Sequence, residues 1–193
     1  MKAIIENILD IIKQNGEEET LLDLSCFRCS PNSDIQEFLL KNAIEFAKKR
    51  ISVTYIVENS DNGELLGYFT LAHKVLEVNA DLLSNTQKRK MEHSAKQSIE
   101  SKTYKVSAFL LAQFGKNYAV DEDKRISGED LLNCVEEIIE KIQYMIGGTV
   151  LYLDCEDKDV LTSFYEQKGR FHKIGERVSE TDNKTYLQYV KFI

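Results

Sequence analysis

Hydrophobic residues recur every three or four positions in several parts of the chain, which is the period of an amphipathic helix. The first of these patterns stops before Gly16, and the clearest one stops before Gly147 and Gly148. Glycine just past a helical pattern is a typical C-terminal signal because it tolerates the left-handed backbone that ends many helices. The pattern predicts helices over residues 2–14, 33–50, 131–145 and 158–168.

Other segments are rich in β-branched and aromatic residues and are bounded by turn residues, which predicts strands. Expected strands cover residues 20–27, 52–58, 65–78, 106–114, 149–155, 171–178 and 185–192. Asp61, Asn62 and Gly63 join the second and third of these strands as a turn, so we expect an antiparallel hairpin there.

The segments 106–114 and 149–155 are nearly continuous apolar runs, as in strands buried on both faces. The long helix at 131–145 lies between them in the sequence. A strand, a helix and a second strand in this order form a right-handed crossover, so these two strands should be parallel.

The length of 193 residues predicts one domain over residues 1–193. It would open with a helix in residues 1–16 and carry a helical insertion at 79–102, where the sequence becomes polar. The predicted fold class is mixed α/β, with a central mixed sheet and helices on both faces. The order of elements argues against a Rossmann or P-loop fold.

Charge and hydropathy narrow the functional classes. The chain has 25 Lys and Arg against 32 Asp and Glu, a net charge of −7, so we expect no DNA partner. Glu6, Asp10 and Lys13 interrupt the apolar start, which excludes a signal-peptide core, and no long apolar run predicts a membrane span. We therefore expect a cytoplasmic protein with no membrane partner.

The four cysteines predict reduced, buried thiols rather than a metal site. Cys26 and Cys29 form one Cys-x-x-Cys pair, and a zinc site needs a second close pair or nearby histidines. The histidines are scattered at His73, His93 and His172. No metal is expected.

The segment between the apolar strand and the long helix has two interpretations. A glycine where a helix starts, here Gly128, lets backbone amides approach an anion such as pyrophosphate. Alternatively, Ser127 and Asp130 form a capping pair and bind nothing.

Tyr165 also has two interpretations. A phenol with an ordinary pKa near 10 stays protonated at neutral pH, so it can donate a proton to a departing thiolate. Alternatively, Phe164 and Tyr165 are core aromatic residues.

In combination, these motifs resemble the GNAT superfamily of acyl-CoA N-acyltransferases. The order is a strand, the Arg-x-x-Gly loop from Arg125 to Gly128, a helix, Gly-Gly, a buried strand, and the Phe-Tyr-x-x-x-Gly segment from Phe164 to Gly169. Upstream, residues 27–43, 53–57 and 67–71 look like the GNAT subgroup that includes toxins acetylating aminoacyl-tRNA. The resemblance covers roughly residues 20–175.

The resemblance implies two parallel strands that splay apart to admit acetyl-CoA as co-substrate. Tyr165 would be the catalytic general acid for attack by a primary amine on the thioester. The backbone of Leu111, Ala112 and Gln113 would pair with the pantetheine arm. The segment that binds the diphosphate would be Arg125, Ile126, Ser127, Gly128, Glu129 and Asp130.

Three residues depart from the family pattern. Asp130 replaces a small residue, Lys158 replaces an asparagine, and Arg170 separates a Gly-Phe pair. They keep open an alternative, a degenerate GNAT domain that binds CoA or a protein without catalysis.

The acceptor and the general base are not fixed by the sequence. The acceptor amine would belong to a small molecule or protein, with aminoacyl-tRNA less favoured by the acidic charge. His73 and Glu77 share one strand face but give no clear general base, and surface residues are the alternative. A monomer and a homodimer are both open.

Overall fold

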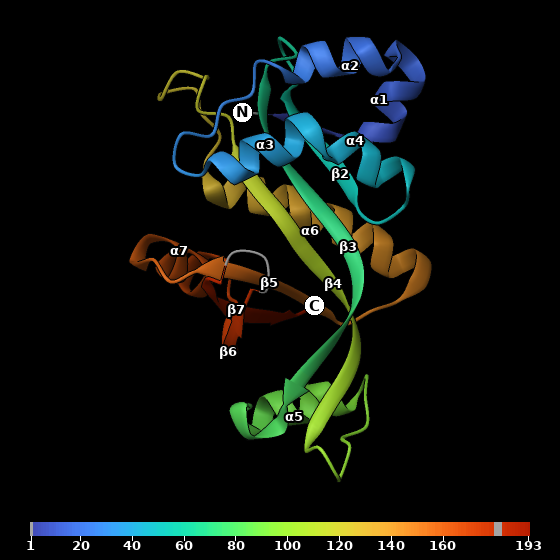
Figure 1. Ribbon diagram of the computed structural model, residues 1–193, viewed down its shortest axis with the longest axis vertical. Coiled ribbons are helices and arrows are strands. Elements are labelled where there is room, and N and C mark those ends of the chain that lie inside the picture. Colours follow the sequence, from blue (N-terminus) through green and yellow to red (C-terminus); the bar gives the residue numbers. More distant parts are fainter. Residues whose placement is uncertain (1, 180–182) are drawn as a thin grey trace. The chain divides into compact units, whose positions relative to one another are not determined.

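The computed structural model describes residues 2–179 and 183–193, and it is a mixed α/β structure, as predicted (Figure 1). Neighbouring strands follow the order β1-β2-β3-β4-β5-β7-β6. The strands are β1 (Ala3–Asn7), β2 (Val53–Asn59), β3 (Leu65–Asn79), β4 (Thr103–Lys116), β5 (Val150–Glu156), β6 (His172–Val178) and β7 (Thr185–Phe192).

The helices include one long element and several short ones. They are α1 (Ile8–Asn15), α2 (Glu17–Leu24), α3 (Ser33–Lys41), α4 (Ala43–Lys48), α5 (Asn85–Glu92), α6 (Gly128–Ile146) and α7 (Asp159–Ser163). A 3₁₀ turn, η1 (Ala80–Leu82), precedes α5, and a π-helix, η2 (Phe164–Lys168), follows α7.

The chain divides into two compact units, which are described separately. Unit 1 comprises Met1–Ala72 and Ala112–Glu140, and unit 2 comprises His73–Leu111 and Lys141–Ile193. The strands β3 and β4 and the helix α6 therefore each contribute residues to both units.

Unit 1 is built on a core that joins helices α1 to α4 to β2 and β3. Phe27 and Tyr68 are fully buried, and their rings meet edge to face at 5.2 Å. The Tyr68 hydroxyl donates to the Ile35 carbonyl at 2.5 Å. The other buried members of this core include Ile8, Leu24, Leu39, Ala43, Ala47 and Ile56.

The predicted N-terminal helix is wrong for its first half. Residues Ala3–Asn7 form β1, which pairs antiparallel with β2, and the helix begins only at Ile8. Asn7 separates the two because its side chain accepts a hydrogen bond from the Leu9 amide at 2.9 Å and caps α1. The apolar spacing was ambiguous here, and pairing with a distant strand decided the outcome.

The strand predicted at 20–27 is also wrong, because Glu17–Leu24 forms the helix α2. Its buried residues are Thr20 and Leu24, one helical turn apart, while Leu22 is 65% exposed. Three glutamates, Glu17 to Glu19, occupy its first turn and complement the positive end of the helix dipole. The single helix predicted at 33–50 is divided at Asn42 into α3 and α4.

Unit 2 confirms the predicted parallel pairing of β4 and β5. Phe109 pairs with Leu151, and Leu110 pairs with Tyr152. β5 is buried on both faces over Val150–Leu153, as expected. β4 is not, because Lys105 and Ser107 are exposed, so its burial alternates. β7 pairs antiparallel with both β5 and β6.

The insertion predicted at 79–102 is helical only in part, since it contains η1 and α5 (Figure 1) but residues 93–102 are not helical. Met91 of α5 is fully buried in a cluster with Leu83, Tyr104 and Val106. The Tyr104 hydroxyl donates to Glu92 Oε1 at 3.2 Å. The insertion is therefore anchored to β4 by apolar contacts, and α5 is not a fully solvated helix.

Candidate functional site

The N-terminus of α6 carries the predicted capping pair. The Asp130 amide donates to Ser127 Oγ at 3.0 Å, and the Ser127 hydroxyl donates to Asp130 Oδ2 at 2.6 Å. The Leu131 amide donates to the Ser127 carbonyl at 3.1 Å, which begins the helical ladder. Ser127 therefore caps α6, and the Asp130 carboxylate accepts the hydrogen bond of the Ser127 hydroxyl. Capping uses the amide of Asp130, while Gly128 and Glu129 supply the remaining amides of the same first turn.

The Arg125 side chain contacts the loop that precedes it. Its Nη2 donates to the Val120 carbonyl at 2.9 Å and to the Tyr118 carbonyl at 3.4 Å. The guanidinium also lies over the Tyr118 ring, 4.6 Å from its centre. The side chain therefore bonds to its own loop, and the role of Arg125 in binding a diphosphate stays a prediction. Ile126, the next residue, is 5% exposed and anchors the loop by burial.

Asn117 has contacts before the α6 loop that the sequence did not suggest. It is 2% exposed, and its Nδ2 donates to the Leu65 carbonyl at 2.8 Å. Its Oδ1 accepts from the backbone amides of Arg28 and Ala119, each at 3.0 Å. A single asparagine at the end of an apolar strand gives no sequence signal for such contacts, because its partners are backbone groups.

The strand residues expected to meet the pantetheine arm lie along β4. Leu111 is buried, Ala112 is exposed and Gln113 is half-buried. In the described part of unit 2, the parallel register ends at Leu110 and Tyr152, and Leu111 has no partner on β5. The addition of an extended ligand to β4 requires that the edge facing β5 is not paired with β5 at this point.

Tyr165 lies in η2 and is 7% exposed, within an aromatic cluster. Its ring centre is 5.8 Å from that of Phe171 and 6.4 Å from that of Tyr189. Burial raises the pKa of Tyr165 well above its ordinary value, so the phenol stays protonated. These contacts fit a core aromatic residue as well as a proton donor.

Two of the departures from the family pattern have clear local roles. Lys158 precedes α7 without capping it through its side chain, and its ammonium forms an ion pair with Glu156. Arg170 has a left-handed φ of 57°. This conformation returns the chain so that the Phe171 amide donates to the Tyr165 carbonyl at 2.9 Å.

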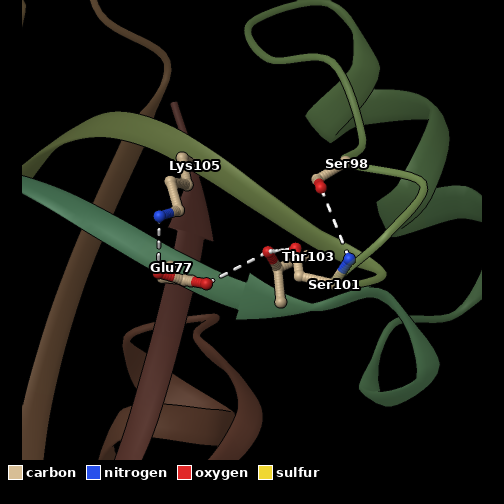
Figure 2. A network of polar contacts seen from close by, with 5 residues as sticks. All are labelled: Glu77, Ser98, Ser101, Thr103 and Lys105. Carbon is tan, nitrogen blue, oxygen red and sulfur yellow. Dashed lines mark hydrogen bonds and ion pairs between the residues drawn. The ribbon is translucent and has the colours of Figure 1, made fainter.

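The two possible bases on β3 are both exposed and both hydrogen-bonded. His73 Nε2 lies 2.8 Å from Ser107 Oγ. Glu77 accepts a hydrogen bond from Thr103 at 3.1 Å and forms an ion pair with Lys105 at 3.3 Å, and this network continues to Ser101 and Ser98 (Figure 2). The Glu77 carboxylate is therefore engaged on both sides by its neighbours on β4.

The cysteines are free, and Cys29, Cys134 and Cys155 are buried as expected. Cys26 is exposed, contrary to expectation. Within residues 2–179 and 183–193, no cluster of three potential metal ligands occurs, and none of the helices has the length and hydropathy to cross a bilayer.

Comparisons with known proteins identify the fold. No family model and no curated protein matches the sequence. A tyrosine-to-phenylalanine variant of KacT matches with a TM-score of 0.65 and 18% identity over 98% of this chain and 95% of that one. AtaT complexed with acetyl-methionyl-tRNAfMet matches with a TM-score of 0.65 and 14% identity, over 96% and 94%. AtaTR bound with AcCoA matches with a TM-score of 0.60 and 16% identity, over 98% and 92%. This chain therefore has the GNAT fold of the AtaT and KacT toxins.

Proposed function

We propose that the chain is an acetyl-CoA-dependent N-acetyltransferase. The observation that carries this proposal is the likeness to AtaTR bound with AcCoA, which extends over 98% of this chain and 92% of that one. Structural likeness over nearly the whole of both chains supports a shared co-substrate. It does so better than the Arg-x-x-Gly loop alone, because isolated loops of this kind are common.

Residues at the start of α6 would bind the diphosphate of acetyl-CoA. Helix α6 is 19 residues long, so its first turn carries the full partial positive charge of a helix N-terminus. Gly128 has no side chain to keep an anion from the backbone amides. The residues proposed for this role are Ile126, Ser127, Gly128, Glu129 and Asp130, with Arg125 acting through the loop.

The pantetheine arm would add to β4 as an extended strand. Leu111, Ala112 and Gln113 supply the backbone groups, and the exposed Ala112 leaves room for a ligand. The end of the parallel register at Leu110 and Tyr152 supports this role.

In the proposed reaction, the acceptor amine attacks the thioester carbonyl carbon directly. The new C–N bond forms, the C–S bond breaks, and the amine loses a proton to water. The Tyr165 hydroxyl gives its proton to the departing thiolate and is reprotonated by solvent. Because burial raises the pKa of Tyr165, the phenol is protonated at neutral pH and its proton is present when the thiolate develops, but the same shift makes Tyr165 a weaker acid than an ordinary tyrosine.

The proposed acceptor is a primary amine, and the α-amino group of an aminoacyl-tRNA belongs to this class. AtaT in complex with acetyl-methionyl-tRNAfMet supports that choice. Charge is also unevenly distributed, because residues 73–111 contain seven Lys and Arg against four Asp and Glu. The acidic average that disfavoured a nucleic-acid partner therefore does not describe this segment. The expectation of no DNA partner stays a prediction, and the likeness to a KacTA–DNA complex gives it no support.

Replacing Tyr165 with phenylalanine tests the catalytic role. The variant should bind acetyl-CoA as the wild type does, because the ring is kept, while turnover falls about 10²-fold, the scale of a lost general acid. Tyr189→Phe is the matched control, because it removes a buried hydroxyl that donates to Glu166 at 3.0 Å in the same cluster. Equal turnover in the two variants would remove Tyr165 from the mechanism.

A second candidate function is a degenerate GNAT domain that binds a protein, or CoA weakly, without turnover. The observation in its favour is the Asp130 carboxylate, which is held at the first turn of α6 by Ser127 and would repel a diphosphate. Calorimetric titration with acetyl-CoA, followed by chromatography of released CoA after adding aminoacyl-tRNA or small amines, separates the candidates. The absence of heat, or heat without CoA release, supports the second candidate, and heat followed by CoA release supports the first.

A further inference from the structure

We propose that Arg125 and Asn117 are positioning residues that hold the loop before α6 in the shape needed to bind the diphosphate. This inference rests on the proposed function, and it assigns to Arg125 a role different from direct contact with the ligand. It concerns only unit 1, in which all the contacts lie.

Asn117 fixes the start of the loop. Its backbone amide donates to the Leu66 carbonyl at 2.8 Å, and its side chain bonds to Leu65, Arg28 and Ala119. All of these partners are backbone groups of β3, of the chain before α3, or of the loop itself. A buried amide with both ends satisfied holds one geometry, because any shift leaves a buried polar group unpaired.

Arg125 fixes the end of the loop. Its guanidinium reaches back to the carbonyls of Tyr118 and Val120 and stacks on the Tyr118 ring. One nitrogen, Nη2, donates both hydrogen bonds while the planar fork of the guanidinium lies over the Tyr118 ring, and a lysine ammonium has no such plane. The buried Ile126 and the capping residue Ser127 come directly after Arg125 in the sequence. The contacts of Arg125 with Tyr118 and Val120 therefore determine where α6 begins.

The geometry of Arg125 argues against a purely structural role. Its Nε is buried and has no hydrogen-bond partner among the described residues. A buried N–H without a partner destabilises the folded state. Replacing Arg125 with methionine, a residue of similar length, removes this unpaired group, which offsets the loss of the two hydrogen bonds. We therefore expect Arg125→Met to change the melting temperature little.

The test compares Arg125→Met and Arg125→Lys with the wild type. Both variants should raise KM for acetyl-CoA about ten-fold and leave kcat within about two-fold, because the loop is displaced while the reacting groups are not. Lys124→Ala is the matched control, since Lys124 is an exposed neighbouring cation that forms an ion pair with Asp121 of the same loop. It should keep the wild-type KM.

Hydrogen exchange gives a readout that does not need acetyl-CoA. The amides of Asp130 and Leu131, which bond to Ser127, should exchange at least about ten-fold faster in both Arg125 variants, and in Tyr118→Leu, than in the wild type. A wild-type KM in Arg125→Lys would show that charge, and not the fork, matters, and would overturn the proposal. Unchanged exchange would overturn it as well. If the wild type binds no acetyl-CoA, the proposed function fails, and the exchange experiment still decides whether Arg125 holds the loop.

Discussion

Gly147 and Gly148 link α6 to β5 and offer a sharp test of the packing in unit 2. Both have left-handed φ values, 73° at Gly147 and 114° at Gly148. A Cβ added at Gly147 would meet nothing within 4 Å. A Cβ added at Gly148 would lie 2.5 Å and 2.7 Å from two ring atoms of Phe109.

The two alanine variants should therefore differ in stability. The left-handed backbone costs each variant about 1–2 kcal/mol. Gly148→Ala also forces Phe109 to move, and overpacking of a core side chain costs about 1–3 kcal/mol more. Phe109 cannot move freely, because it is 3% exposed and its backbone pairs with Leu151. The loss is about 2–5 kcal/mol for Gly148→Ala and about 1–2 kcal/mol for Gly147→Ala.

Calorimetric melting measures the difference. For a chain of this size, each kcal/mol corresponds to about 2–4 °C. Gly148→Ala should therefore melt about 4–20 °C below the wild type. A double variant, Phe109→Leu with Gly148→Ala, should recover part of the loss, because leucine lacks the outer ring atoms that the new Cβ meets. Equal melting temperatures for Gly147→Ala and Gly148→Ala would refute the argument, as would the absence of coupling to Phe109.

Three further predictions concern single side chains. Thr54→Val should lower the free energy of unfolding by about 1–3 kcal/mol, because it leaves the fully buried Thr70 hydroxyl, 2.8 Å away, without this partner. In urea titrations the double variant Thr54→Val/Thr70→Val should recover most of that loss, and a double variant that loses the sum of the two single losses would contradict this. Burial, and then Glu6 and Asp23, raises the pKa of Glu58 in the folded state, so its ionisation weakens folding as the pH rises through that pKa. Glu58→Gln should raise the melting temperature at pH 7 but not at pH 4, and equal effects at both would count against the pKa shift. Arg170→Gly should raise the melting temperature by a few degrees, since φ is 57° there, and a lower value would show that the side chain has an unrecognised stabilising contact.

Several parts of the fold followed from the sequence because the determining interactions are local. The long apolar period of α6, the glycines after it, and the Ser127–Asp130 spacing each predicted what the structure contains. Two apolar runs on either side of that helix were enough to predict the parallel pairing of β4 with β5. The specific motifs of the resemblance to GNAT proteins lie in this same half of the chain, and residues 27–43, 53–57 and 67–71 add to it.

Tertiary structure decided what short or polar segments do. The apolar runs of β1 and α2 fit a helix and a strand equally well. Pairing with β2 made the first a strand, and burial of one helical face in the unit 1 core made the second a helix. The position of β7 between β5 and β6 has no local signal, because pairing partners are chosen across the folded sheet. The roles of Asn117 and Arg125 were hidden for the same reason. Their partners are backbone carbonyls and amides, which every residue carries, so only the folded chain brings these groups to the right side chains.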